Sequence, residues 1–114
     1  MVRQLPQIKS IELVNNKAVI TLYIQPELKY FSGHFEHFPI LPGVAQLDWA
    51  IYYASEYFKQ SFQLSGMDLI KYQQPVKPGA LLTLELLWLS DKNKLQFHYF
   101  DHECTYSKGK VKLR

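Results

Sequence analysis

Short runs of apolar and β-branched residues, separated by turn-forming residues, indicate that most of the chain forms strands. Residues 8–14 and 18–25 are two such runs, and Asn15-Asn16-Lys17 lies between them. Because Asn tolerates the positive φ of a tight turn, this stretch predicts a β-hairpin. Later strands are predicted at residues 67–76, 81–89, 94–104 and 110–113, with turns at residues 91–93 and 107–109. The last predicted strand is short, so we expect that edge of the sheet to be small or covered.

One stretch, residues 44–59, has the spacing of a helix rather than a strand. Val44, Leu47, Ile51 and Phe58 fall on one helical face, and most of the remaining surface is also apolar or aromatic. A helix that is apolar on nearly every side is buried on several sides, so other elements must wrap around it. The predicted fold class is therefore α+β, with five or six antiparallel strands around one long central helix.

The composition favours a single folded domain over residues 1–114. Hydrophobic residues make up 47% of the chain, and no Gly/Ser linker or internal repeat divides it, which favours one packed core over disorder. Cys104 is the only cysteine, so no internal disulfide can form and a reducing cytoplasm is the expected compartment. No apolar run reaches transmembrane length. The formal charge of +3 is too small to indicate a nucleic-acid partner.

Two titratable residues flank the start of the predicted helix. Gly33 permits backbone conformations closed to other residues, so its loop can place His34 tightly, and an imidazole can accept and return a proton near neutrality. Asp48, in the second helical turn, falls beside Val44 and Ile51 on an apolar face, where a carboxylate costs free energy unless it has a partner. The alternatives are a loop histidine that only bonds a backbone carbonyl and a helix-start carboxylate that faces water.

The helix start itself could bind a developing negative charge. The first amides of a helix have no internal partner and point out of its N-terminus. Here they belong to Gly43 and Val44, and they could hold a thioester oxygen as it gains enolate charge. Pro-Gly is also a common way to begin an ordinary helix, so this feature carries weight only together with His34 and Asp48.

A longer motif connects these residues. His34 and Asp48 stand fourteen positions apart, and Gln74-Pro75-Val76-Lys77-Pro78-Gly79 follows later in the chain. Both features resemble the signature of hotdog-fold 3-hydroxyacyl-carrier-protein dehydratases, whose second motif is a Pro-Val-x-Pro-Gly turn. The segment Leu47-Asp48-Trp49-Ala50 is most similar to the short branch found in aryl-polyene clusters. Other positions on the family's pattern are Phe31, Gly33, Phe35, Pro39, Ile40, Pro42, Gly43 and Val44.

That resemblance implies a hotdog fold paired into a dimer, with His34 of one subunit facing Asp48 of the other. The implied reaction is dehydration of a 3-hydroxyacyl thioester to the trans-2-enoyl thioester in fatty-acid or polyene lipid biosynthesis. By the same resemblance, the Gly43 amide polarises the thioester carbonyl, His34 removes the α-proton, and Asp48 helps to protonate the leaving hydroxyl. No metal or redox cofactor is implied. The implied partners are an acyl group on an acyl carrier protein or coenzyme A, and a second identical subunit, a higher oligomer or a related subunit in a pseudo-heterodimer.

Two other functions stay open. A hotdog thioesterase would use a carboxylate on the same helix to activate water. A non-catalytic acyl-binding or scaffold subunit would keep only the fold, and Glu36-His37, which stands where many dehydratases have Pro-Gly, gives that alternative some weight.

Two further groups of residues have weaker signals. His98, His102 and Cys104 could share a strand face, but no fourth ligand accompanies them, so no metal site is expected. Lysines near the predicted strand turns, namely Lys29, Lys71 and Lys77, could attract an acidic carrier protein, although such residues most simply form a solvated face.

Overall fold

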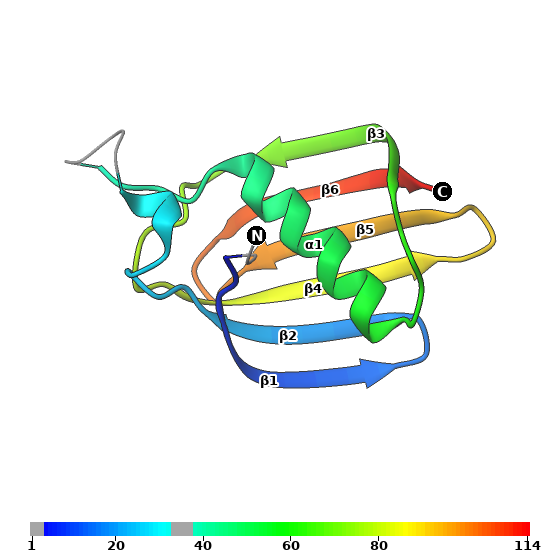
Figure 1. The fold of residues 1–114 in the computed structure, drawn as a ribbon, viewed down its shortest axis with the longest axis horizontal. Helices are drawn as coiled ribbons and strands as arrows, with labels where there is room; N and C mark the ends of the chain where they lie inside the picture. The colour runs from blue at the N-terminus through cyan, green and yellow to red at the C-terminus, as the bar shows by residue number, and fades with distance from the viewer. Residues whose placement is uncertain (1–3, 33–37) are drawn as a thin grey trace.

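The computed structural model describes residues 4–32 and 38–114. These residues form an antiparallel six-stranded sheet with one long helix lying across one of its faces (Figure 1). The elements are β1 Gln7–Val14, β2 Lys17–Tyr23, the 3-10 helix η1 Lys29–Phe31, α1 Gly43–Tyr57, β3 Leu64–Tyr72, β4 Leu81–Leu89, β5 Lys94–Phe100 and β6 Thr105–Leu113. The strand order across the sheet is β1-β2-β4-β5-β6-β3. This is the α+β arrangement that the sequence predicts.

The hairpin and the helix lie where the sequence predicts them. Asn15 has a φ of 54° in the turn between β1 and β2, and Asn93 has a φ of 51° in the turn between β4 and β5. Both values fall in the left-handed region, which Asn enters more readily than most residues. Strand β4 matches its predicted range, and α1 begins one residue earlier and ends two residues earlier than predicted.

Two strands differ from the prediction. β6 is nine residues long and lies between β5 and β3, so it is neither short nor at an edge of the sheet. The turn predicted at residues 107–109 lies inside this strand. Gly109 marks a close approach of neighbouring strands, because an added Cβ would sit 2.8 Å from the carbonyl oxygen of Leu69. β3 begins three residues earlier and ends four residues earlier than predicted, at Leu64 and Tyr72.

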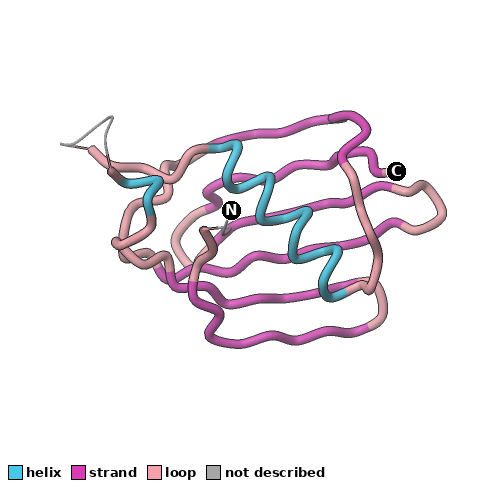
Figure 2. Tube along the Cα trace, viewed as in Figure 1, coloured by secondary structure: helices cyan, strands magenta, loops and turns pink. Residues whose placement is uncertain are grey.

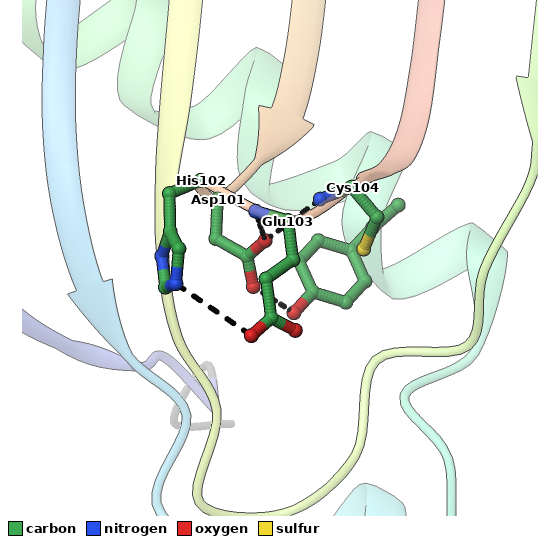
Figure 3. A network of polar contacts seen from close by, with 5 residues as sticks. Asp101, His102, Glu103 and Cys104 are labelled. Atoms are coloured by element: carbon green, nitrogen blue, oxygen red, sulfur yellow. Dashed lines mark hydrogen bonds and ion pairs between the residues drawn. The ribbon is translucent and has the colours of Figure 1, made fainter.

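The turn that precedes β6 is held by Asp101. Its Oδ1 atom accepts hydrogen bonds from the backbone N–H groups of Glu103 at 2.8 Å and Cys104 at 3.0 Å (Figure 3). Its Oδ2 atom accepts a hydrogen bond from the Tyr106 hydroxyl. These bonds favour the ionised carboxylate and lower the pKa of Asp101, with the Tyr106 hydroxyl as the largest cause. The strand predicted at residues 94–104 therefore ends at Phe100.

The core lies between α1 and the face of the sheet that it covers. Alternate residues of β2 and β5, and of most of β4, are buried, as expected for strands with one covered face. Trp49, Ala50 and Ala54 of α1 have no exposed surface. The helix is not covered as fully as its sequence predicts, because Val44 is 74% exposed and Asp48 is exposed near it. One strip of α1 therefore remains open in the single chain.

Loops gather at one end of the sheet, where the helix begins (Figure 2). The Leu41 N–H, two residues before the helix, donates a 2.8 Å hydrogen bond to the Val76 carbonyl. The turn after Val76 is fixed to the end of β2 in the same way, because the Gly79 N–H donates to the Ile24 carbonyl at 2.7 Å. Gly79 has a φ of 84°, a conformation that favours glycine. The motif at residues 74–79 thus holds the segment that leads into α1.

We expect Tyr106→Phe to destabilise the protein at neutral pH and to have a smaller effect in acid. The pKa of Asp101 lies below its ordinary value of 3.8, so its bond to Tyr106 stabilises the fold fully above that value. This contribution is lost as the pH falls through the lowered pKa, because the carboxylate is then protonated in both states. Urea unfolding of both proteins, at neutral pH and at the lowest pH where both still fold, measures the difference. An equal loss at the two pH values would contradict the assignment.

Candidate functional site

The helix start lies near the end of β3, at one edge of the sheet (Figure 1). The Pro42 carbonyl accepts hydrogen bonds from the Ala45 N–H at 3.1 Å and the Gln46 N–H at 3.3 Å. Gly43 and Val44 come before these first helical donors, in the positions whose N–H groups have no partner within the helix. Their amides also lie at the positive end of the helix dipole. The structure thus places the predicted anion-binding amides at the β3 edge.

Tyr72, the last residue of β3, packs directly on this helix start. Its hydroxyl donates a 3.0 Å hydrogen bond to the Gly43 carbonyl. A Cβ added to Gly43 would lie 2.6 Å from the Cζ atom of the Tyr72 ring, so the ring occupies the space that any larger residue would need. Burial raises the pKa of Tyr72, and its hydroxyl therefore stays protonated and able to donate at neutral pH.

Asp48 lies on the open strip of α1. With Val44, Leu47 and Ile51 it lines a surface hollow of about 460 Å³ that extends to Leu64 at the start of β3. Asp48 thus lies beside these apolar side chains, and its role in a site stays a prediction. The strip is apolar but open, because the sheet packs against the other side of the helix. Asp48 is accordingly exposed in the single chain.

The predicted base lies outside the described residues. Residues 33–37 are outside the description, and they include Gly33, His34 and the Glu36-His37 pair. The elements that bracket the segment are η1 and α1. The structure therefore brings together Gly43, Val44 and Asp48, and the position of His34 relative to them stays a prediction.

Three polar side chains that were not predicted from the sequence are buried beneath the helix start. Gln46, Ser107 and Tyr99 are 3%, 0% and 1% exposed. The Ser107 hydroxyl donates to Oε1 of Gln46 at 2.6 Å, and the Tyr99 hydroxyl donates to the Gln46 carbonyl at 2.7 Å. Burial raises the pKa of Tyr99 well above its ordinary value, so it also remains a donor. The sequence signal for this group is a Gln among apolar helical positions.

The structure does not bring His98, His102 and Cys104 together as a metal site. Within residues 4–32 and 38–114, no group of three His, Cys, Asp or Glu side chains could hold a metal ion. His98 belongs to β5, where its Nε2 atom lies 2.8 Å from the Thr105 hydroxyl, whereas His102 and Cys104 belong to the following turn (Figure 3). Burial lowers the pKa of His98. In the described part of the chain, no helix has the length and hydrophobicity needed to cross a membrane.

The model of the ApeI-like family, described as ApeI dehydratase, matches residues 10–110. This chain belongs to the ApeI-like dehydratase family. The match includes the helix start, Asp48 and the turn that holds Leu41. The resemblance drawn from the sequence motifs is therefore confirmed at the level of the family.

Solved structures of ApeI-like and other proteins share this fold. The dehydratase heterocomplex ApeI:P from Xenorhabdus doucetiae contains a chain with 39% identity and a TM-score of 0.87, with 95% of this chain and 96% of that chain covered. An uncharacterized protein from Erwinia carotovora subsp. atroseptica has 36% identity and a TM-score of 0.85, with 96% of each chain covered. The E. coli PaaI protein, with 18% identity and a TM-score of 0.63 over 92% of this chain and 80% of that chain, is similar in fold alone. These likenesses confirm the predicted hotdog fold.

The FabZ enzymes are more distant relatives of the chain. The 3-hydroxyacyl-(acyl-carrier-protein) dehydratase FabZ of Bordetella pertussis is 30% identical over an alignment of 91 residues, with 67% of this chain and 60% of that protein covered. The FabZ of Psychromonas ingrahamii is 32% identical over an alignment of 71 residues, with 54% of this chain and 47% of that protein covered. The chain thus spans about half of the length of the curated relatives that it matches.

We expect Gly43→Ala to displace the Tyr72 ring from the helix start. The added methyl group needs the space of the ring, and Tyr72 is 52% exposed and can rotate into solvent. The variant then loses the hydrogen bond to the Gly43 carbonyl, which contributes up to about 1 kcal/mol to the free energy of unfolding. In a Tyr72→Phe background the same substitution should cost less, because that bond is already absent. Urea unfolding of the single and double variants measures this coupling, and additive losses would contradict the contact.

Proposed function

We propose that this chain is a hydro-lyase that removes water from a 3-hydroxyacyl thioester to give the trans-2-enoyl thioester. The observation that carries the proposal is the location of Asp48 and the Gly43 and Val44 amides, which lie within the first two turns of α1 at the β3 edge. In a chain of the ApeI-like dehydratase family, this arrangement offers an anion-binding helix start and an acid group on one accessible surface.

The proposed elimination starts at the carbon next to the thioester carbonyl. His34 accepts the proton of this α-carbon, and the Gly43 N–H donates a hydrogen bond to the carbonyl oxygen as the oxygen gains negative charge. The electron pair of the broken C–H bond forms the C=C bond, and the C–O bond at the β-carbon breaks. The leaving hydroxyl takes a proton from the Asp48 carboxylic acid and departs as water. Return of the α-proton from His34 to Asp48 through solvent restores both groups.

The hollow beside Asp48 offers a place for the acyl chain. It is lined by Val44, Leu47 and Ile51 on one side and by Phe62 and Leu64 on the other. Its volume of about 460 Å³ is in the range of small-molecule sites. We therefore place the thioester at the helix start and the alkyl part of the substrate along the open strip of α1. An acyl carrier protein or coenzyme A would carry the thioester, as part of fatty-acid or polyene lipid biosynthesis.

A partner subunit would complete this site. β3 is an edge strand, and its Met67 and Leu69 are 61% and 57% exposed. An edge strand presents N–H and C=O groups that can pair with a strand of another chain, and the open strip of α1 begins at the same edge. We propose that a second subunit joins along β3, covers this strip and brings its own His34 toward Asp48. The Xenorhabdus assembly is a heterocomplex, so the partner is either a second copy of this chain or a related subunit.

We expect Asp48→Asn and His34→Ala each to lower kcat for dehydration by about a hundredfold or more. The amide in Asp48→Asn cannot supply the proton that the leaving hydroxyl needs, and the alanine in His34→Ala cannot accept the α-proton. General acid–base catalysis contributes a factor of about 10²–10⁴ to a rate. The measurement is the absorbance of the conjugated enoyl product formed from a 3-hydroxyacyl thioester, with the related partner subunit added where the chain alone is inactive.

The matched control for this test is Asp91→Asn. It makes the same chemical change at an exposed residue in the turn between β4 and β5, and it should leave kcat unchanged. Wild-type turnover in folded His34→Ala or Asp48→Asn would remove that residue from the mechanism. Release of a free acid and a thiol instead of an enoyl product would show a thioesterase.

We expect Met67→Glu to weaken subunit association and activity together. The substitution places a charge on the exposed apolar edge of β3, where pairing with another subunit would bury it. Leu13→Glu is the matched control, because Leu13 is an exposed apolar residue, 47% exposed, on the opposite edge strand β1. Sedimentation velocity of both variants, alone and with the related subunit, gives the assembly state. Dissociation by Leu13→Glu but not by Met67→Glu would place the interface at β1 instead.

A further inference from the structure

We propose that Gln46 and the hydroxyls of Tyr72, Ser107 and Tyr99 are positioning residues that set the first turn of α1 for catalysis. The inference rests on the proposed function, because it takes the amides of that turn and Asp48 of the next turn as the groups that act in the dehydration. It goes beyond that function by naming side chains that act through the helix and do not touch the substrate.

The three hydroxyls form one row across neighbouring strands. Ser107 of β6 is paired with Tyr72 of β3 on one side and with Tyr99 of β5 on the other. Directly paired residues in a sheet point to the same face, and here that is the face covered by α1. Figure 1 shows the first turns of the helix lying over this part of the sheet. The strand register therefore places three hydroxyl donors beneath one short segment of the helix.

Each hydroxyl donates to a different acceptor of that segment. The acceptor of Tyr72 is the Gly43 carbonyl, at 3.0 Å. Tyr99 donates to the Gln46 carbonyl at 2.7 Å, and Ser107 to the Gln46 side-chain oxygen at 2.6 Å. The Gln46 amide nitrogen in turn donates to the Leu41 carbonyl at 3.3 Å, just before the helix. The network thus ties the entry loop and the first turn of α1 to three strands.

Burial makes this network sensitive to the position of the helix. Gln46, Ser107 and Tyr99 are almost fully enclosed, and a buried polar group left without its partner destabilises the fold. A shift or rotation of α1 would break several of these bonds at once, because all of them end on residues 41–46. Apolar residues of similar size would fill the same space without this directional constraint. Polar side chains at these sites therefore favour one position of the helix over slightly shifted or rotated positions.

The rate of the proposed reaction depends on this position of the helix. A displacement of about 1 Å in a reacting group can lower a rate by about a hundredfold, and Gly43 and Asp48 both move with this turn. The amides must point at the oxygen in the transition state, so misplacement should reduce kcat more than it raises KM.

The decisive variant is the double substitution Gln46→Met with Ser107→Ala. It replaces two buried partners by apolar groups, so the loss of stability should come mainly from the Leu41 carbonyl, which loses its donor, and the variant should still fold while the positional constraint is lost. We expect kcat per folded molecule to fall about tenfold or more with KM within about twofold, the pattern of a lost transition-state interaction. Tyr99→Phe should act in the same direction. Tyr106→Phe is the matched control, because its hydroxyl bonds Asp101, away from the helix, and it should lose stability without losing kcat.

Amide hydrogen exchange at residues 43–47, read by NMR, supplies a second measurement that does not depend on activity. Faster exchange there in the double variant and in Tyr99→Phe, with no change in Tyr106→Phe, would support the positioning role. Wild-type kcat and wild-type exchange in the folded double variant would overturn it. If the wild-type chain fails to dehydrate with any partner while exchange still responds, the proposed function fails and the structural part of the inference stands.

Discussion

The packing of one face of α1 against the sheet is the contact on which the rest of this structure depends. Trp49, Ala50 and Ala54 have no exposed surface, and they share one apolar cluster with the inward residues of β2, β4 and β5. Burial of a large apolar side chain contributes about 1.5–3 kcal/mol, a sizeable part of the net stability of about 5–15 kcal/mol for a domain. Among the described elements, α1 is the long helix that covers this face, so its general orientation follows from this contact.

Apolar packing does not by itself fix the helix along its own axis. Hydrophobic side chains of suitable volume tolerate small shifts, and uniqueness of structure is lost before stability when only volume is satisfied. Hydrogen bonds are directional, and those that reach Gln46 from β5 and β6 define one position. The contact of the Tyr72 ring with Gly43 adds a steric limit at the helix start. The fold thus separates two tasks: apolar area supplies stability, and a few buried polar atoms supply the position.

The sequence predicts the helix, the first hairpin and β4 well, because each has a clear local signal. The Asn15-Asn16 turn and the spacing of Val44, Leu47 and Ile51 are examples. The prediction failed between β5 and β6, where Ser107-Lys108-Gly109 has the composition of a turn but lies within a strand. Gly109 is needed for close approach to Leu69, a contact between distant segments that no local pattern contains.

Some residues of the candidate site could likewise be predicted from the sequence, and others could not. The motif around Asp48 and Gly43 is contiguous, so the sequence could predict that these residues share the helix start. The row of Tyr72, Ser107 and Tyr99 depends on the register of three strands, which is set by long-range pairing. A single β-bulge changes which residues face each other, and β3 has register shifts before Tyr72. The hydroxyl row could therefore be found only in the folded molecule.

The open strip of α1 links the architecture to the proposed chemistry. A carboxylate on an apolar face is stable in the single chain because water still reaches Asp48. A subunit that covered the strip would remove this water, and exclusion of water strengthens the electrostatic interactions inside a site. The same association would bury the apolar side chains Val44 and Ile51, so the free energy of assembly could offset the cost of desolvating the acid. The proposed partner subunit would therefore supply more than a second catalytic group, because its arrival would also exclude water from the proposed site around Asp48.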